Sequence, residues 1–102
     1  MYFYKRLYTS DSLKKKKRQI VWKLKMRKFM PSVYVIALPQ SNDLLEIYHS
    51  ALLKQPYYKQ YSPFIVGIAK NYMEAVELTQ KILMDVKRNT GDYDVKGFCQ
   101  GI

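Results

Sequence analysis

The chain has few of the residues on which several classes of protein depend. Its one cysteine, Cys99, excludes an internal disulfide, and with it a disulfide-stapled secreted scaffold. His49 is the only histidine. Cys99 and His49 alone do not make a recognisable zinc site, because such a site usually has about four ligands. No glycine-rich phosphate cradle of the GxGxxG or GxxxxGK[ST] type is present. We therefore expect neither a metal nor a cofactor.

Long hydrophobic runs are also missing. The longest, residues 33–38 and 64–68, fall far short of the roughly 20 apolar residues that span a bilayer. The opening MYFYKRLYTS carries positive charge but no apolar run of about 7–15 residues, so we expect no signal peptide. Tyrosine at position 2 excludes N-myristoylation. These features predict a cytoplasmic protein without a transmembrane segment.

Acidic residues are scarce at one end of the chain. Lys and Arg number 18 against 8 Asp and Glu, which gives a net charge of +10. Residues 1–30 hold eleven of the bases and a single acid, Asp11, while residues 31–102 hold seven of each sign. The whole net charge therefore lies in the first 30 residues, and this asymmetry bears more directly on function than any other feature of the sequence.

The remaining composition is that of an ordinary globular protein, with 48% apolar and 25% charged residues. A length of 102 residues fits a single domain. We divide it into a basic N-terminal arm and helix (1–30), a sheet with a C-terminal helix (31–90) and a tail (91–102).

The basic segment predicts an extended arm or edge strand followed by a helix. Residues 2–9 are aromatic-rich and loosely alternating, and Lys5 and Arg6 suit the edge of a sheet. Apolar residues then recur at helical offsets over residues 11–28, after residue types that cap helices. Residues 20–26 also alternate as a strand would; we favour the helix.

A β-hairpin is predicted next. Residues 33–38 are a continuous apolar run typical of a strand buried on both faces. Residues 39–43 have turn chemistry, and residues 44–49 alternate between apolar and polar. We expect Ser50 to cap a short helix that Pro56 ends.

The second half predicts a strand and the clearest helix of the chain. Residues 64–69 form the strand, in which Gly67 indicates a bulge or a close backbone approach. Asn71 is a good N-cap for a helix over residues 72–89, and Gly91 suits its left-handed termination. The tail is expected to lie against the domain through its apolar residues, among them Tyr93, Val95 and Phe98.

Taken together, the elements predict an α+β fold in the order α-β-β-α-β-α. We expect two main helices and a mixed or antiparallel sheet of three strands, or of four if the N-terminal arm joins it. Such an order allows the helices to cover one face of the sheet.

The stretches VYVIALP, LLEIYHS and PFIVGIAKNYMEAVEL resemble small uncharacterised bacterial proteins with no assigned activity. The resemblance covers roughly residues 30–95. It implies a bacterial, cytoplasmic, α+β protein, and it transfers no catalytic or binding residue to this chain.

The sequence offers few combinations of residues that could act in catalysis. On a strand, Glu46 and His49 point to opposite faces, so they form no dyad. Cys99 and His49 could act as nucleophile and base only if the tail folded onto the hairpin. Asp92 and Asp94 flank Tyr93 in what we interpret as a solvated turn. We therefore expect a non-catalytic protein.

The basic segment favours binding of a polyanion such as nucleic acid, because phosphate contacts need only well-placed positive charge. Trp22, and the tyrosines around Lys59, could stack on bases. The residues predicted to contact phosphates, without base specificity, are Lys14, Lys15, Lys16, Lys17, Arg18, Lys23, Lys25, Arg27 and Lys28.

Three alternatives stay open at this point. The lysines could serve only to keep a protein-interaction or structural module soluble. The set Trp22, Leu24, Met26 and Phe29 among lysines also resembles a segment that seeks a membrane surface or an acidic partner. A homodimer that pairs sheet edges or helices is compatible with any of these functions.

Overall fold

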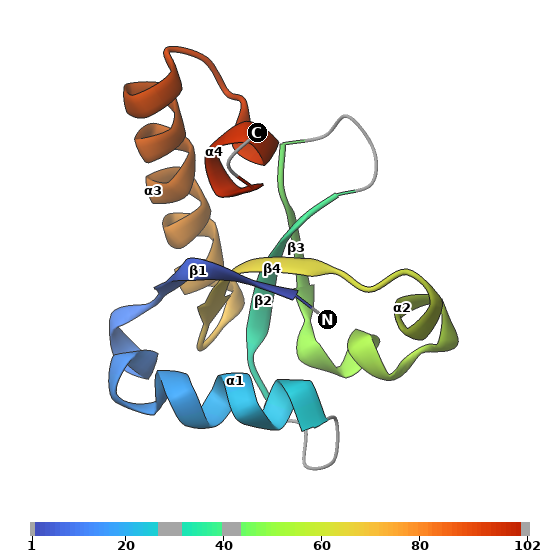
Figure 1. Ribbon diagram of the computed structural model, residues 1–102. Helices are drawn as coiled ribbons and strands as arrows, with labels where there is room; N and C mark the ends of the chain where they lie inside the picture. Colours follow the sequence, from blue (N-terminus) through green and yellow to red (C-terminus); the bar gives the residue numbers. More distant parts are fainter. Residues whose placement is uncertain (1, 27–31, 40–43, 101–102) are drawn as a thin grey trace.

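A four-stranded mixed sheet runs through the structure, a computed structural model that describes residues 2–26, 32–39 and 44–100 (Figure 1). The strand order is β1-β4-β2-β3. The α+β class is therefore confirmed, with the larger of the two expected strand numbers. The helices cover both faces of the sheet, not one as expected. The reason is that strand residues from both faces are apolar, so each face needs its own cover.

The N-terminal arm supplies the extra strand. β1 (Tyr2–Thr9) lies at one edge of the sheet and pairs in parallel with β4 (Phe64–Ala69). Lys5 and Arg6 are exposed on this edge, which agrees with the prediction made from their charge.

The predicted hairpin is confirmed in shorter form. β2 (Tyr34–Leu38) pairs antiparallel with β3 (Glu46–His49), and β2 is also antiparallel to β4. Of the predicted turn, residues 40–43 lie outside the described residues. The strand β3 is the other edge of the sheet.

Both features predicted from Gly67, a bulge and a close backbone approach, are confirmed. The β2–β4 register shifts just after the pair formed by Gly67 and Ile36. A Cβ atom at Gly67 would lie 3.1 Å from Cδ1 of Ile36 and 3.4 Å from Cδ2 of Leu78. The glycine therefore lets β4 lie close both to β2 and to the helix that contains Leu78.

The basic segment packs on one face of the sheet. It consists of a 3-10 helix, η1 (Asp11–Lys16), followed by α1 (Lys17–Met26). Residues 17–26 are helical, so the strand alternative for residues 20–26 is wrong. A strand would place Trp22 on the same face as Ile20 and Leu24, but Trp22 is 61% exposed and the other two are 5% and 0% exposed. The core on this face consists of Leu7, Leu13, Ile20, Leu24, Val33, Val35, Ala37, Leu53, Ile65 and Ile68.

The long C-terminal helix covers the opposite face. α3 (Tyr72–Thr90) is capped at its N-terminus by Asn71, whose Oδ1 accepts a hydrogen bond of 2.9 Å from the backbone N–H of Glu74. It ends at Gly91, which has a φ of 75°. Both predicted ends are therefore confirmed to within one residue.

The tail adds a short helix, α4 (Val95–Gln100), beside α3. Val95 and Cys99 are buried in the core of this face, whereas Tyr93, which we expected to lie against the domain, is 46% exposed. The Tyr93 ring instead lies under the ammonium of Lys87, 5.0 Å from its centroid.

The connection between β3 and β4 differs from the expectation in detail. It folds as a 3-10 helix, η2 (Ser50–Lys54), and an α-helix, α2 (Pro56–Gln60). As expected, a short helix ends just before Pro56. Pro56 also begins α2, because the first helical turn does not require the missing N–H of proline. The side-chain cap of η2 is His49, not Ser50, whose buried hydroxyl faces the backbone N–H of Val33.

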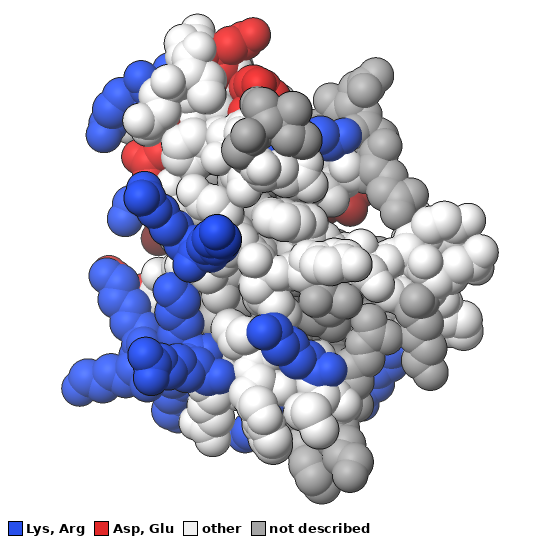
Figure 2. Space-filling view, viewed as in Figure 1, with Lys and Arg blue, Asp and Glu red and all other residues white. Residues whose placement is uncertain are grey.

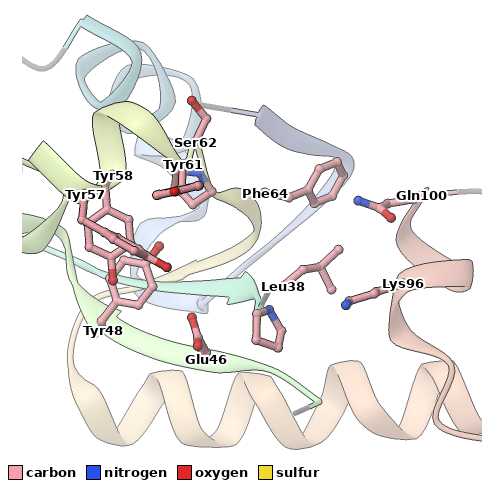
Figure 3. A pocket seen from close by; sticks show the side chains of 12 residues that line it. Leu38, Glu46, Tyr48, Tyr57, Tyr58, Tyr61, Ser62, Phe64, Lys96 and Gln100 are labelled. Atoms are coloured by element: carbon pink, nitrogen blue, oxygen red, sulfur yellow. The ribbon is translucent and has the colours of Figure 1, made fainter. Parts of the chain in front are cut away.

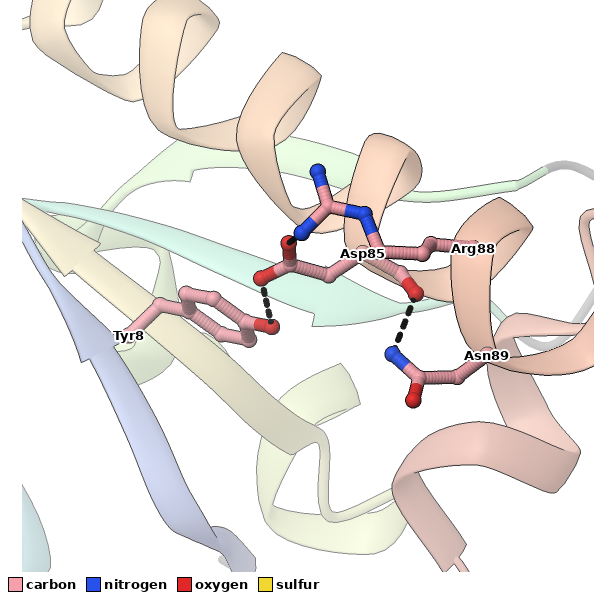
Figure 4. Close-up of polar contacts among 4 residues, drawn as sticks. All are labelled: Tyr8, Asp85, Arg88 and Asn89. Atoms are coloured by element: carbon pink, nitrogen blue, oxygen red, sulfur yellow. Dashed lines mark hydrogen bonds and ion pairs between the residues drawn. The ribbon is translucent and has the colours of Figure 1, made fainter.

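A hydrogen bond ties the edge strand β1 to α3, which covers one face of the sheet (Figure 4). The hydroxyl of Tyr8 donates a hydrogen bond of 2.7 Å to Oδ2 of Asp85. Arg88 lies 3.9 Å from the same carboxylate, and the side-chain amide of Asn89 donates to the backbone carbonyl of Asp85. This contact helps to hold β1, and with it Lys5, at a fixed place relative to the body of the domain.

Candidate nucleic-acid interface

Seven of the nine residues predicted to contact phosphates belong to η1 and α1, and Arg27 and Lys28 lie outside the described residues. Lys17 and Lys23 are half-buried, because they flank the buried stripe of α1. The exposed members are Lys14, Lys15, Lys16, Arg18 and Lys25. Amphipathic packing therefore leaves most of the cationic groups in solvent.

Folding leaves this charge largely uncompensated. Within the part of the chain that the structure describes, Lys14 alone of the seven forms an ion pair, at 2.9 Å from Asp11. Lys14 thereby lowers the pKa of the Asp11 carboxyl. In Figure 2, Lys and Arg side chains gather over η1, α1 and β1 at the lower left, whereas Lys and Arg are mixed with acidic side chains at the opposite end, near the end of α3. The asymmetry of the sequence thus becomes an asymmetry in space.

A groove of 360 Å³ runs between β1 and α1, within the roughly 300–1,000 Å³ range of ligand sites. One wall comes from β1, where three of the four lining residues stand at alternate positions and share a face of the strand. The other comes from α1 positions one helical turn apart, with Arg18 and Trp22 beside them. The residues that line the groove are Phe3, Tyr4, Lys5, Leu7, Lys17, Arg18, Val21, Trp22 and Lys25.

The groove combines apolar and cationic side chains. Leu7 is buried and Val21 is half-buried among the core residues of this face. Lys5, Lys17, Arg18 and Lys25 supply four cations, and no acidic residue lines the groove. The ammonium of Lys25 lies 5.5 Å from the centroid of the Phe3 ring, so one wall reaches across to the other. Such a surface suits an extended anion with flat apolar parts.

Sequence reasoning missed half of this groove. It identified Lys17, Arg18 and Lys25 from the charge run, but it treated Phe3 and Lys5 as part of a separate arm. The alternation of residues 2–9 was a usable signal, because it places Phe3, Lys5 and Leu7 on one face. Only the packing of α1 against that face brings the two segments together.

The apolar residues of the basic segment do not form one exposed stripe. Trp22 and Met26 are 61% and 51% exposed, whereas Leu24 is fully buried against the sheet. Phe29 lies outside the described residues. Within the part of α1 that is described, Leu24 is therefore held in the core, and the exposed apolar surface is limited to Trp22 and Met26, one helical turn apart.

The tyrosines around Lys59 lie elsewhere, in a hollow of 480 Å³ between α2, β3 and α4 (Figure 3). Tyr48, Tyr57 and Tyr58 cluster at one side of it, with ring centroids 5.0–5.2 Å apart between neighbours. Lys96 and Gln100 face them from α4. This hollow shares no lining residue with the β1–α1 groove, so the two sets of aromatic residues do not form one surface.

The hydroxyl of Tyr48 is buried and has no hydrogen-bond partner among the described residues. Burial raises the pKa of Tyr48, and also those of Tyr4, Tyr8 and Tyr58. In the unfolded chain these phenols release their protons near pH 10, whereas the folded protein retains them to higher pH. Stability therefore decreases as the pH rises above about 10.

We expect Tyr48→Phe to raise the free energy of unfolding by about 1 kcal/mol at pH 7, because it removes an unpaired buried hydroxyl. Above pH 10 the variant should also lose stability less steeply than wild type, by up to about 1.4 kcal/mol per pH unit. Urea unfolding at pH 7 and pH 10.5 measures both effects. A variant less stable at pH 7, with an unchanged alkaline slope, would contradict this account of Tyr48.

The residues considered for catalysis have local structural roles. Nδ1 of His49 accepts a hydrogen bond from the backbone N–H of Ala51, and its Nε2 lies 3.1 Å from Oγ of Ser32. Burial raises the pKa of the Cys99 thiol to about 11, so its thiolate is scarce at neutral pH. Asp92 and Asp94 accept hydrogen bonds from nearby backbone N–H groups.

No metal-binding cluster of three or more His, Cys, Asp or Glu residues occurs among the described residues. In the same part of the chain, no helix combines the length and the apolar character needed to cross a membrane. Comparisons with protein-family models, with curated proteins and with solved structures found no match for this chain. The resemblance to small bacterial proteins therefore stays an expectation.

Proposed function

We propose that this protein is a non-catalytic module that binds nucleic acid without sequence specificity, through η1, α1 and the neighbouring edge strand β1. The observation that carries the proposal is the cationic surface formed by these three elements, which is almost free of ion pairs within the described residues. We expect this activity in a bacterial cytoplasm, in line with the sequence.

The charge arrangement supports a phosphate backbone as the ligand. Phosphate contacts dominate the affinity of proteins for nucleic acids and do not depend on base identity. Lys14, Lys15 and Lys16 follow one another on η1, and Arg18 and Lys25 lie two turns apart on α1. Lys5 extends the cationic surface onto β1. The cationic groups are thus spread over three neighbouring elements.

Equilibrium binding to a fluorescent oligonucleotide over a range of salt concentrations tests the proposal. If the four cations of the groove each neutralise one phosphate, log K should fall with log salt at a slope of about −2.8 for single strands and about −3.6 for duplex. Affinity that does not change with salt, or a dissociation constant in the millimolar range at 50 mM salt, would contradict it.

The alternative function is a protein-interaction or structural module, in the form of a homodimer. The edge strands β1 and β3 are the places where a second copy could extend the sheet. Sedimentation at several protein concentrations, with and without nuclease treatment, separates the two functions. A dimer that is free of nucleic acid and ignores oligonucleotides would favour the alternative.

A further inference from the structure

Trp22 is the only tryptophan of the chain, and it lies in the middle of the cationic surface. Its side chain is 61% exposed, although the same helix buries Ile20 and Leu24 almost completely. An indole that stays exposed to water contributes little to the stability of the fold. Most of its surface is therefore available to a ligand.

The neighbours of Trp22 are cations and a flexible apolar residue. Arg18 precedes it by one helical turn, Lys25 and Met26 follow it by one turn, and Lys5 faces the groove from β1. A flat aromatic surface surrounded by cations matches a nucleotide, which has a flat base and a charged phosphate. In a duplex, however, the faces of the bases are stacked on one another and are not accessible to a side chain.

From this geometry we infer that the groove selects single-stranded nucleic acid, with a base stacked on the Trp22 indole and its flanking phosphates at Arg18, Lys25, Lys5 and Lys17. The inference rests on the proposed function and adds the class of nucleic acid. Base–aromatic stacking is worth about 1–3 kcal/mol per base and tolerates any sequence. A membrane surface is the less favoured ligand, because Leu24 is not available to it.

The test uses the intact protein and the fluorescence of its single tryptophan. Single-stranded DNA or RNA of about eight nucleotides, and a duplex of equal length, are titrated at 50 mM and 200 mM salt. We expect the single strand to quench the emission of Trp22 and to bind more tightly than the duplex. Vesicles containing phosphatidylserine serve as a third ligand.

Two variants, measured by anisotropy of the labelled oligonucleotide, complete the experiment. Trp22→Ala should weaken single-strand binding by about tenfold and duplex binding by less than twofold, and Trp22→Phe should restore most of the loss. Met26→Ala, which removes the exposed neighbour on the same face, should change neither by more than twofold. Both positions are exposed, so the fold should tolerate the changes.

The outcomes separate this inference from the function on which it rests. Salt-dependent binding of both ligands with unchanged emission, and with no effect of Trp22→Ala, would overturn the stacking model and leave the proposed function standing. Tighter binding to the vesicles, with blue-shifted emission, would overturn it in favour of a membrane surface. Absence of binding to any ligand at 50 mM salt would overturn both.

Discussion

The double variant Arg18→Glu/Lys25→Glu is expected to bind single-stranded nucleic acid at least 25-fold more weakly than wild type at 0.1 M salt. Each lost phosphate contact changes log K by about 0.7 at this concentration, which is a factor of about 5, and the new carboxylates add repulsion. Both side chains are exposed, so the fold should persist. Anisotropy of a labelled oligonucleotide measures the affinity, and circular dichroism measures the fold.

The matched control is Lys54→Glu/Lys87→Glu, which makes the same change in net charge on η2 and α3. Because these lysines are not among the groove residues, the control should lose no more than about threefold through the general field. Equal losses in the two double variants would show that net charge alone drives binding. The basic surface would then not be a site.

The second large effect concerns how α1 is held in place. Leu24 is fully buried between α1 and the sheet, so Leu24→Ala should lower the free energy of unfolding by about 2–5 kcal/mol. This is a large fraction of the roughly 5–15 kcal/mol that stabilises a typical domain. Urea denaturation followed by far-ultraviolet circular dichroism measures the change.

Met26→Ala is the control on the same helix, since Met26 is 51% exposed. We expect it to change stability by about 0.5 kcal/mol or less. A small effect of Leu24→Ala, comparable to that of Met26→Ala, would mean that α1 does not dock on the sheet. The groove between β1 and α1 would then lose its second wall.

Local chemistry made much of the fold predictable. The cap at Asn71, the left-handed Gly91 and the glycine inside β4 each have one strong stereochemical reason, and each is confirmed. By contrast, Pro56 and Ser50 have two uses each, because proline ends one helix as readily as it begins the next and serine can cap or pack. Neighbouring sequence does not decide between such uses. Pro56 follows the end of η2, as expected, but it also begins α2, and the cap of η2 is His49 instead of Ser50.

The arrangement of elements that are distant in the sequence was harder to predict. The number of strands depended on whether residues 2–9 pair with a strand about 60 positions later, and the energy of that pairing comes from contacts that local patterns do not contain. The groove could not be predicted for the same reason, because it also depends on long-range packing. Charge alone predicted its helix wall, whereas Lys5 joins it only because β1 is the sheet edge beside α1.

Backbone amide chemical shifts in the presence of a single-stranded oligonucleotide test the central claim most directly, because they locate the contact as well as detect it. The account predicts that the largest shift changes occur in β1 around Lys5 and in α1 from Lys17 to Lys25, and that they diminish at 0.5 M salt. Changes centred on the hollow of Tyr48, Tyr57 and Tyr58, or no changes at saturating oligonucleotide, would contradict it.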